Sequence, residues 1–175
     1  YLGGEEIPLA NKDELQKQLP VIKKKFLYAG DFAKASMNDI FSKEKLLDAR
    51  IFTANYFANA VLLNRGSLNF TTEPLPWEAQ LSPLRDAVIV DANGDGLPDI
   101  LLAGNYYDNT IQLGRYDADY GTIAVNKGAG KFECRSLNGI ALKGQTRRIR
   151  TITINGQPAF VVAKNNDSLT VIKFK

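Results

Sequence analysis

The chain has 175 residues, with no His, a single Cys and a formal net charge of +3 from 22 basic and 19 acidic residues. The lack of His excludes hydrolases with a His base and His-ligated zinc sites, and a lone Cys excludes an intrachain disulfide framework and cysteine-ligated metal clusters. The small surplus of positive charge does not indicate a nucleic-acid partner, and no apolar run of about 18 residues predicts a membrane span. The side chains that remain available to a binding site offer mostly oxygen atoms, which suit hard cations such as calcium.

The first 55 residues are predicted to form a helical segment that packs on a following β part, because about 50 residues bury too little surface to fold alone. Each expected helix begins after a side chain that can accept a hydrogen bond from its first turn. The expected helices and their caps are 12–19 after Asn11, 32–41 after Asp31, and 43–49 after Ser42.

The rest of the chain repeats itself with a period near 60 residues. Residues 63–70 (LNRGSLNF) match 125–132 (VNKGAGKF), and residues 96–105 (GLPDILLAGN) match 156–165 (GQPAFVVAKN). Asn-x-Gly and Asn-Gly turns indicate hairpins, and four short strands per unit are typical of a propeller blade. The expected strands are 58–63, 69–75, 86–90 and 100–104 in the first unit and 122–125, 131–137, 149–154 and 159–163 in the second.

The sequence therefore predicts a mainly β fold that forms a partial β-propeller of about two four-stranded blades. The first blade is expected over 56–112 and the second over 113–175. Because a propeller closes with at least four blades, either further blades lie in a longer parent chain or the helices cover the open ends. The chain begins at Tyr1, without Met or a signal-peptide pattern, so we expect it to be a piece of a longer protein.

The strongest chemical signal is the acidic stretch 91–99, DANGDGLPD. Its oxygen-bearing groups fall at alternate positions of a tight loop, where with water they supply the six or seven oxygen ligands that calcium prefers. Magnesium fits less well because it demands a near-ideal octahedron. An EF-hand is excluded, since its twelfth position requires Glu and here holds Leu102. The candidate ligands are Asp91, Asn93, Asp95, the backbone carbonyl of Leu97, and Asp99.

The alternative for this stretch is a metal-free hairpin whose Asn and Asp side chains bind their own backbone. The second repeat serves as an internal control. It carries Thr153, Asn155 and Ala159 at the first, third and ninth positions, and it lacks two residues that match the fifth and sixth. That unit keeps its turn without the acidic ligands, so the acids are not needed for the fold alone and we expect one calcium site.

The stretch 113–121, LGRYDADYG, joins the two units and is rich in aromatic and charged residues. Such a segment can bind a sugar or a partner's peptide, or it is an inter-blade loop that satisfies its own hydrogen bonds. Asp117 and Asp119 could also act as the paired carboxylates of a glycoside hydrolase. The weaker candidate ligand-binding residues are Arg115, Tyr116, Asp117, Asp119 and Tyr120.

The 91–99 loop between two strands, preceded by the 64–70 hairpin, resembles an FG-GAP/VCBS repeat, the calcium-binding blade of integrin α-chain propellers. With 113–121 included, the chain resembles the C-terminal part of large bacterial VCBS-repeat proteins of the ASPIC/UnbV type over about residues 10–170. The resemblance implies that the five candidate ligands bind calcium, and that the chain belongs to a larger cell-envelope or secreted protein with propeller architecture.

We therefore expect a non-catalytic, calcium-binding propeller segment of an extracytoplasmic protein. The calcium is expected to be structural, and the partner to be a protein or carbohydrate, besides the remainder of the parent chain. The alternative is a glycan-processing or accessory hydrolase domain that uses 113–121.

Overall fold

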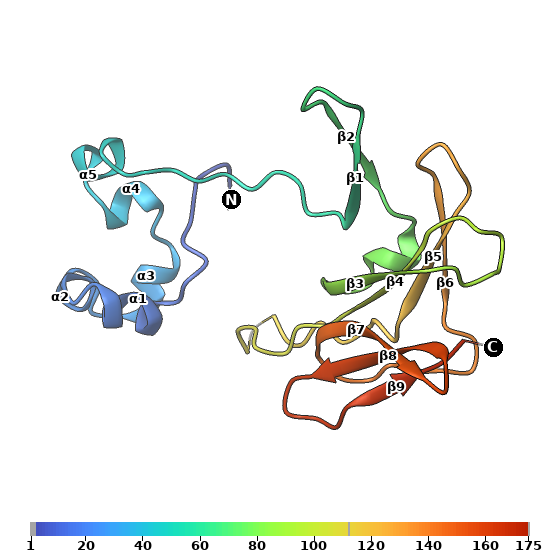
Figure 1. The fold of residues 1–175 in the computed structure, drawn as a ribbon. Coiled ribbons are helices and arrows are strands. Elements are labelled where there is room, and N and C mark those ends of the chain that lie inside the picture. The colour runs from blue at the N-terminus through green and yellow to red at the C-terminus, as the bar shows by residue number, and fades with distance from the viewer. Residues whose placement is uncertain (1–2, 112, 175) are drawn as a thin grey trace. The chain divides into compact units, whose positions relative to one another are not determined.

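The computed structural model describes residues 3–111 and 113–174 (Figure 1). The chain divides into two compact units, Tyr1–Asn55 and Tyr56–Lys175. The first unit is helical and the second consists of three small antiparallel sheets, so the chain is mainly β with an N-terminal helical segment, as predicted. None of the helices in the described residues is long and apolar enough to cross a membrane.

In its described part, the first unit consists of five short helices around a small apolar core. Ile22, Phe32, Ala35 and Ile40 are the buried residues of that core. The ring of Phe26 packs edge-on against Phe32, with 5.5 Å between ring centroids. The helices are α1 (Lys12–Gln18), α2 (Val21–Lys25), α3 (Ala29–Ala33), α4 (Met37–Ile40) and α5 (Lys43–Leu47).

Two of the three expected helix caps are confirmed. The side chain of Asn11 accepts a hydrogen bond from the backbone N–H of Glu14 at 2.9 Å, and the Glu14 carboxylate accepts one from the N–H of Asn11. The hydroxyl of Ser42 accepts a hydrogen bond from the N–H of Lys45. These polar side chains satisfy N–H groups that a helix start leaves without a partner.

The expected helix over 32–41 is wrong. Asp31 lies inside α3 and caps nothing, and the chain starts a second helix, α4, only a few residues later. Ser36 and Asp39 form a reciprocal capping box at that start, in which each side chain accepts a hydrogen bond from the other residue's N–H. This local capping outweighs the continuous apolar periodicity from which one long helix was predicted.

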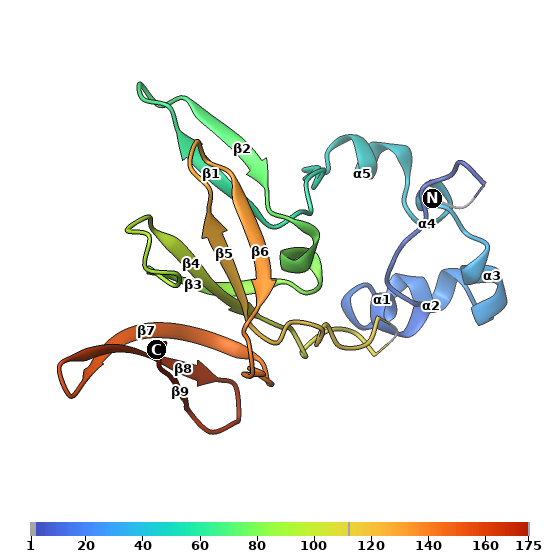
Figure 2. The same ribbon diagram turned by 90° about the vertical axis from the view of Figure 1, so that its right-hand side faces the viewer.

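The second unit contains three antiparallel sheets, ordered β1-β2, β3-β4-β5-β6 and β7-β8-β9 (Figure 2). A short 3₁₀ helix, η1 (Trp77–Gln80), connects β2 to β3. Residues of the last two sheets share one buried apolar cluster, which includes Leu101, Ile123 and Ile149. The strands are β1 (Ala60–Asn64), β2 (Phe70–Pro74), β3 (Leu84–Val90), β4 (Asp99–Gly104), β5 (Thr122–Asn126), β6 (Phe132–Ser136), β7 (Thr146–Ile154), β8 (Gln157–Lys164) and β9 (Thr170–Ile172).

These sheets correct the expected grouping of strands into blades at 56–112 and 113–175. β2 does not pair with β3, because the connection between them carries prolines and η1. β4 pairs instead with β5, so the four-stranded sheet joins the second half of one sequence repeat to the first half of the next. A sequence period gives the length of a repeat, but it does not say at which strand a sheet begins.

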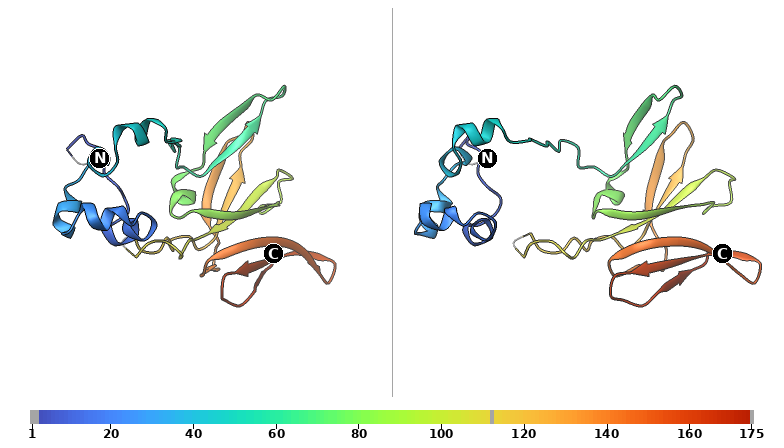
Figure 3. Two further views of the ribbon diagram at one scale, coloured as in Figure 1. Left: turned by 90° about the vertical axis from the view of Figure 1, so that its left-hand side faces the viewer. Right: turned by 60° about the vertical axis from the view of Figure 1, so that its left-hand side comes forward.

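The hairpins that begin each repeat have the same geometry. The N–H of Gly66 donates to the side-chain oxygen of Asn64 at 2.8 Å, and the N–H of Gly128 donates to that of Asn126 at 2.9 Å. Both hairpin tips point the same way (Figure 3), and a Cβ on Gly130 at the second tip would collide with the Leu63 side chain of the first hairpin. The repeat seen in sequence is therefore also a structural repeat.

The hairpins that end each repeat also match. β3–β4 has a register shift between residues 84 and 86, and β7–β8 has one at the equivalent place, between 146 and 148. A shared irregularity at one position indicates that both hairpins bend in the same way.

Asp86 connects β3 to β7, which belong to different sheets. Its Oδ2 accepts a hydrogen bond from the N–H of the buried Ile149 at 2.8 Å and contacts the Arg150 guanidinium at 3.0 Å. Burial opposes ionisation, but the N–H groups of Ile149 and Ala87 and the charge of Arg150 outweigh it and hold the pKa of Asp86 below its ordinary value.

We expect Asp86→Ala to lower the free energy of unfolding by about 1–3 kcal/mol, because the buried N–H of Ile149 loses its acceptor. Arg150→Ala should cost about 1 kcal/mol or less, since that side chain is 63% exposed. Urea denaturation measures both losses, and equal losses would contradict a dominant backbone hydrogen bond.

The loss in Asp86→Ala should also depend on pH. The pKa of Asp86 is lower in the folded than in the unfolded chain, so its stabilising effect is present above the ordinary pKa and disappears as the pH falls through the folded value. The difference between Asp86→Ala and the unchanged protein should therefore be full at neutral pH and shrink in acid.

Candidate functional site

The acidic loop connects β3 to β4, and its last residue, Asp99, pairs with Val90 across the hairpin. Gly94 and Gly96 have φ angles of +78° and +80°, a conformation that other residues adopt only with strain. In the second repeat the same connection is a two-residue Asn-Gly turn between paired strand residues, with positive φ at both positions. The second loop is therefore shorter, as the sequence predicts.

Side chains of the loop bind its own backbone. Asp91 accepts hydrogen bonds from the N–H groups of Gly94 at 2.8 Å and Gly96 at 3.0 Å. Asp95 accepts one from the N–H of Leu97 at 2.8 Å. These are the contacts of the metal-free alternative, but each carboxylate oxygen can accept more than one hydrogen bond or ligand contact. The same bonds hold the loop in a tight turn.

Asp99 differs from the other loop acids because it is fully buried, with 0% of its surface exposed. Its two oxygens accept hydrogen bonds from the N–H groups of Ala92 at 3.0 Å and Asn126 at 2.8 Å. Within the described residues, no Lys or Arg forms an ion pair with it. Ala159, at the equivalent place in the second repeat, is equally buried. The equivalent place in the second repeat therefore accommodates an apolar residue, whereas in the first repeat the acid ties the loop to β5 through the N–H of Asn126.

The described residues contain no group of three or more acidic or Cys side chains already gathered to hold a metal. The side-chain amide of Asn93 donates to Asp95 at 2.8 Å, and its oxygen accepts a hydrogen bond from the N–H of Asp95 at 3.0 Å. The donor set nevertheless fits calcium, because every proposed ligand is an oxygen atom.

Two residues of the β5–β6 hairpin adjoin the loop, and the sequence did not connect them to it. The Asn126 amide donates to the carbonyl of Pro98 at 3.2 Å, in addition to the Asn126 N–H bond to Asp99. Hydrogen bonds from Leu97 and Asn93, together with the charge of Lys127, hold the pKa of Asp95 below its ordinary value. Only the pairing of β4 with β5 brings this hairpin to the loop, and no local sequence pattern indicates that pairing.

The 113–121 stretch does not gather its five candidate side chains on one site. The backbone of Tyr116 pairs with that of Tyr106, and the Arg115 guanidinium lies over the Tyr107 ring, 5.0 Å from its centroid. Asp117 is exposed to solvent. Tyr120 is half exposed. Much of this stretch is therefore occupied by contacts with residues 106 and 107.

Asp119 is buried and holds the start of β5 against the end of β4. Its carboxylate accepts hydrogen bonds from the N–H groups of Gly104 at 2.6 Å and Gly121 at 3.1 Å. The side chain of Asn105 bonds to both the N–H and the carbonyl of Asp119. Burial raises the pKa of Asp119 against the lowering effect of its hydrogen bonds. For Asp119, the structure supports the alternative of a loop that satisfies its own hydrogen bonds.

No protein-family model, curated protein sequence or solved structure matches this chain. The assignment of a site therefore depends on the residues and their geometry. Of the two candidates, the 91–99 loop places its oxygen-bearing side chains within one tight turn, whereas the 113–121 stretch directs Arg115 and Asp119 into separate contacts.

We expect Asp119→Asn to lower the free energy of unfolding by about 1–3 kcal/mol, because an NH₂ group then faces a buried backbone N–H. Asp117→Asn, on an exposed side chain two residues away, should change it by about 0.5 kcal/mol or less. Chemical denaturation followed by circular dichroism measures both. If the two changes had the same effect, Asp119 would not have the structural role described.

Proposed function

We propose that the 91–99 loop binds one calcium ion and that the β unit is a non-catalytic propeller segment stabilised by it. The observation that carries the proposal is that three carboxylates, Asp91, Asp95 and Asp99, lie within one nine-residue loop and form no ion pair within the described residues. Two backbone hydrogen bonds lower the cost of burying the charge of Asp99, and a bound cation would lower it further.

Calcium would be held by the loop's own oxygens and would have a structural effect. It would neutralise three carboxylates that lie within nine residues and fix the connection between β3 and β4. Through Asp99, which also accepts the N–H of Asn126, the same ion would strengthen the contact between this loop and β5. The proposed ligands are Asp91, Asn93, Asp95, the carbonyl of Leu97, and Asp99.

The order of the strands supports the propeller part of the proposal. Four consecutive strands form the central sheet, with the acidic loop between its first and second strands. The first strand, β3, lies beside β7, the first strand of the next sheet. Neighbouring sheets that meet along their first strands are typical of propeller blades around a common axis.

We place the protein outside the cytoplasm and expect it to bind a protein or carbohydrate, as its resemblance to VCBS-repeat proteins implies.

We do not propose glycoside hydrolysis at 113–121. Asp119, one of the two carboxylates it would need, is buried and accepts backbone hydrogen bonds through both of its oxygens. Asp117 is exposed to solvent.

The calcium site is tested by thermal unfolding in about 2 mM calcium, in magnesium, and in excess EDTA. A site with a Kd of about 10⁻⁴ M should add about 1.8 kcal/mol of stability by mass action, which raises Tm by several degrees. Magnesium should give a much smaller rise. Asp95→Ala should abolish the calcium-specific rise, because it removes an exposed ligand and leaves the buried contacts of Asp99 intact.

Asp117→Ala is the matched control, since it removes an exposed acid outside the loop and should keep the full rise. Two results would contradict the proposal. One is the same Tm in calcium and in EDTA. The other is a loss of stability in Asp95→Ala that is as large in EDTA as in calcium.

A further inference from the structure

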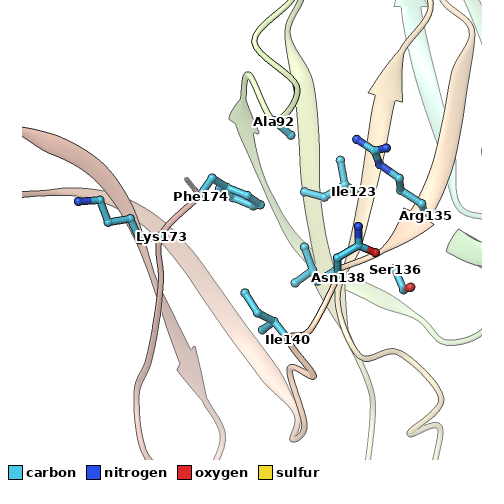
Figure 4. Close-up of a pocket in the computed structure, with 9 residues that line it drawn as sticks. Ala92, Ile123, Arg135, Ser136, Asn138, Ile140, Lys173 and Phe174 are labelled. Atoms are coloured by element: carbon cyan, nitrogen blue, oxygen red, sulfur yellow. The ribbon is translucent and has the colours of Figure 1, made fainter.

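A small pocket lies between the β5–β6 hairpin, the loop that follows β6, and the chain just after β9 (Figure 4). Its volume is about 310 Å³, at the lower end of the range of small-molecule sites. The apolar part of its lining comes from Ile123, Leu137, Ile140 and Phe174. Arg135, Ser136 and Asn138 provide polar groups from the adjacent strand and loop.

Regular structure and packing hold the walls of this pocket in place. Ile123 and Arg135 are direct partners in the pairing of β5 with β6, so the ladder fixes their spacing. The ring of Phe174 packs edge-on against Phe160 of β8, with 5.6 Å between ring centroids. A site built on strands and packed rings needs little ordering when a ligand binds.

Two polar side chains of the pocket have no bonded partner in the described part of the chain, although the charge of Arg135 adds to that of Lys127 in lowering the pKa of Glu133. Arg135 and Asn138 form no ion pair and no side-chain hydrogen bond with any residue that the structure describes. Figure 4 shows both side chains across the pocket from the ring of Phe174, whereas Lys173 extends away from it. An unpaired guanidinium beside an apolar wall can bind a carboxylate through two parallel hydrogen bonds.

The composition of the lining selects among ligand classes. Among the described residues that line the pocket none is acidic, which disfavours a cation. The charged side chain that faces the pocket, Arg135, favours an anion over a neutral sugar. A free phosphate would leave the apolar part of the lining without contacts. A carboxylate attached to an apolar body uses both parts.

We propose that this pocket binds a small carboxylate with an aromatic or branched apolar body. The carboxylate pairs with Arg135, and the Asn138 amide is a further donor within the same lining. The apolar body packs against Phe174 and Ile140. This inference goes beyond the proposed function, and it does not depend on the calcium site.

The acidic loop (91–99) nevertheless borders the pocket. Ala92 belongs to both, since it lines the pocket and its N–H donates to the buried carboxylate of Asp99. Binding must therefore be measured both with calcium and with EDTA, so that a failure of one proposal is not mistaken for a failure of the other.

The test is isothermal titration calorimetry with phenylacetate, and with its neutral amide 2-phenylacetamide as the matched ligand. Phenylacetate should bind saturably, at least about tenfold more tightly than the amide, because only the carboxylate pairs with the guanidinium. Arg135→Gln should raise the Kd of phenylacetate at least about tenfold. Arg148→Gln removes another exposed arginine outside the pocket and should leave the affinity unchanged.

Lack of saturable binding in both calcium and EDTA would overturn the inference. So would equal binding of phenylacetate and its amide, or binding that Arg135→Gln leaves unchanged. Because Arg135 is exposed, its variant should fold normally, which circular dichroism checks. Binding of phenylacetate in a protein that shows no calcium-dependent rise in Tm would support the carboxylate pocket and reject the calcium loop.

Discussion

The β unit depends on aspartates that accept hydrogen bonds from backbone N–H groups outside the regular ladders. Asp86 does so between two sheets, Asp99 between the acidic loop and β5, and Asp119 between the ends of β4 and β5. A buried N–H without an acceptor costs about as much free energy as a lost hydrogen bond. Small sheets leave many such groups at their edges and corners, and in this unit carboxylates satisfy several of them.

Local features of the fold could be predicted from the sequence, because they depend on residues close together in the chain. Helix caps at Asn11 and Ser42, the Asn-x-Gly hairpins and the shortened second loop are of this kind. The grouping of hairpins into sheets could not be predicted, since pairing between distant strands leaves no local pattern. The burial of Asp119 and the contact of Asn126 with the acidic loop follow from that grouping and were missed for the same reason.

The two repeats allow one type of hairpin to be compared with and without the acidic residues of the loop. Asp99 and Ala159 occupy equivalent, equally buried places, and the hairpins around them share their register shift. The flanking hairpin is therefore shared by the two repeats, and the first repeat differs in its longer, acidic loop. A cation site added to such a scaffold can strengthen one connection without any change in the sheets that carry it.

The sequence separation across the contact of Asp86 with Ile149 has a kinetic consequence. These residues are 63 positions apart, whereas the hairpins that they join form between neighbouring strands. Contacts that close long loops are expected to form late in folding, after local hairpins. Interactions absent from the transition state affect the unfolding rate more than the folding rate. We therefore expect this contact to set how long the β unit stays folded and to have little effect on how quickly it folds.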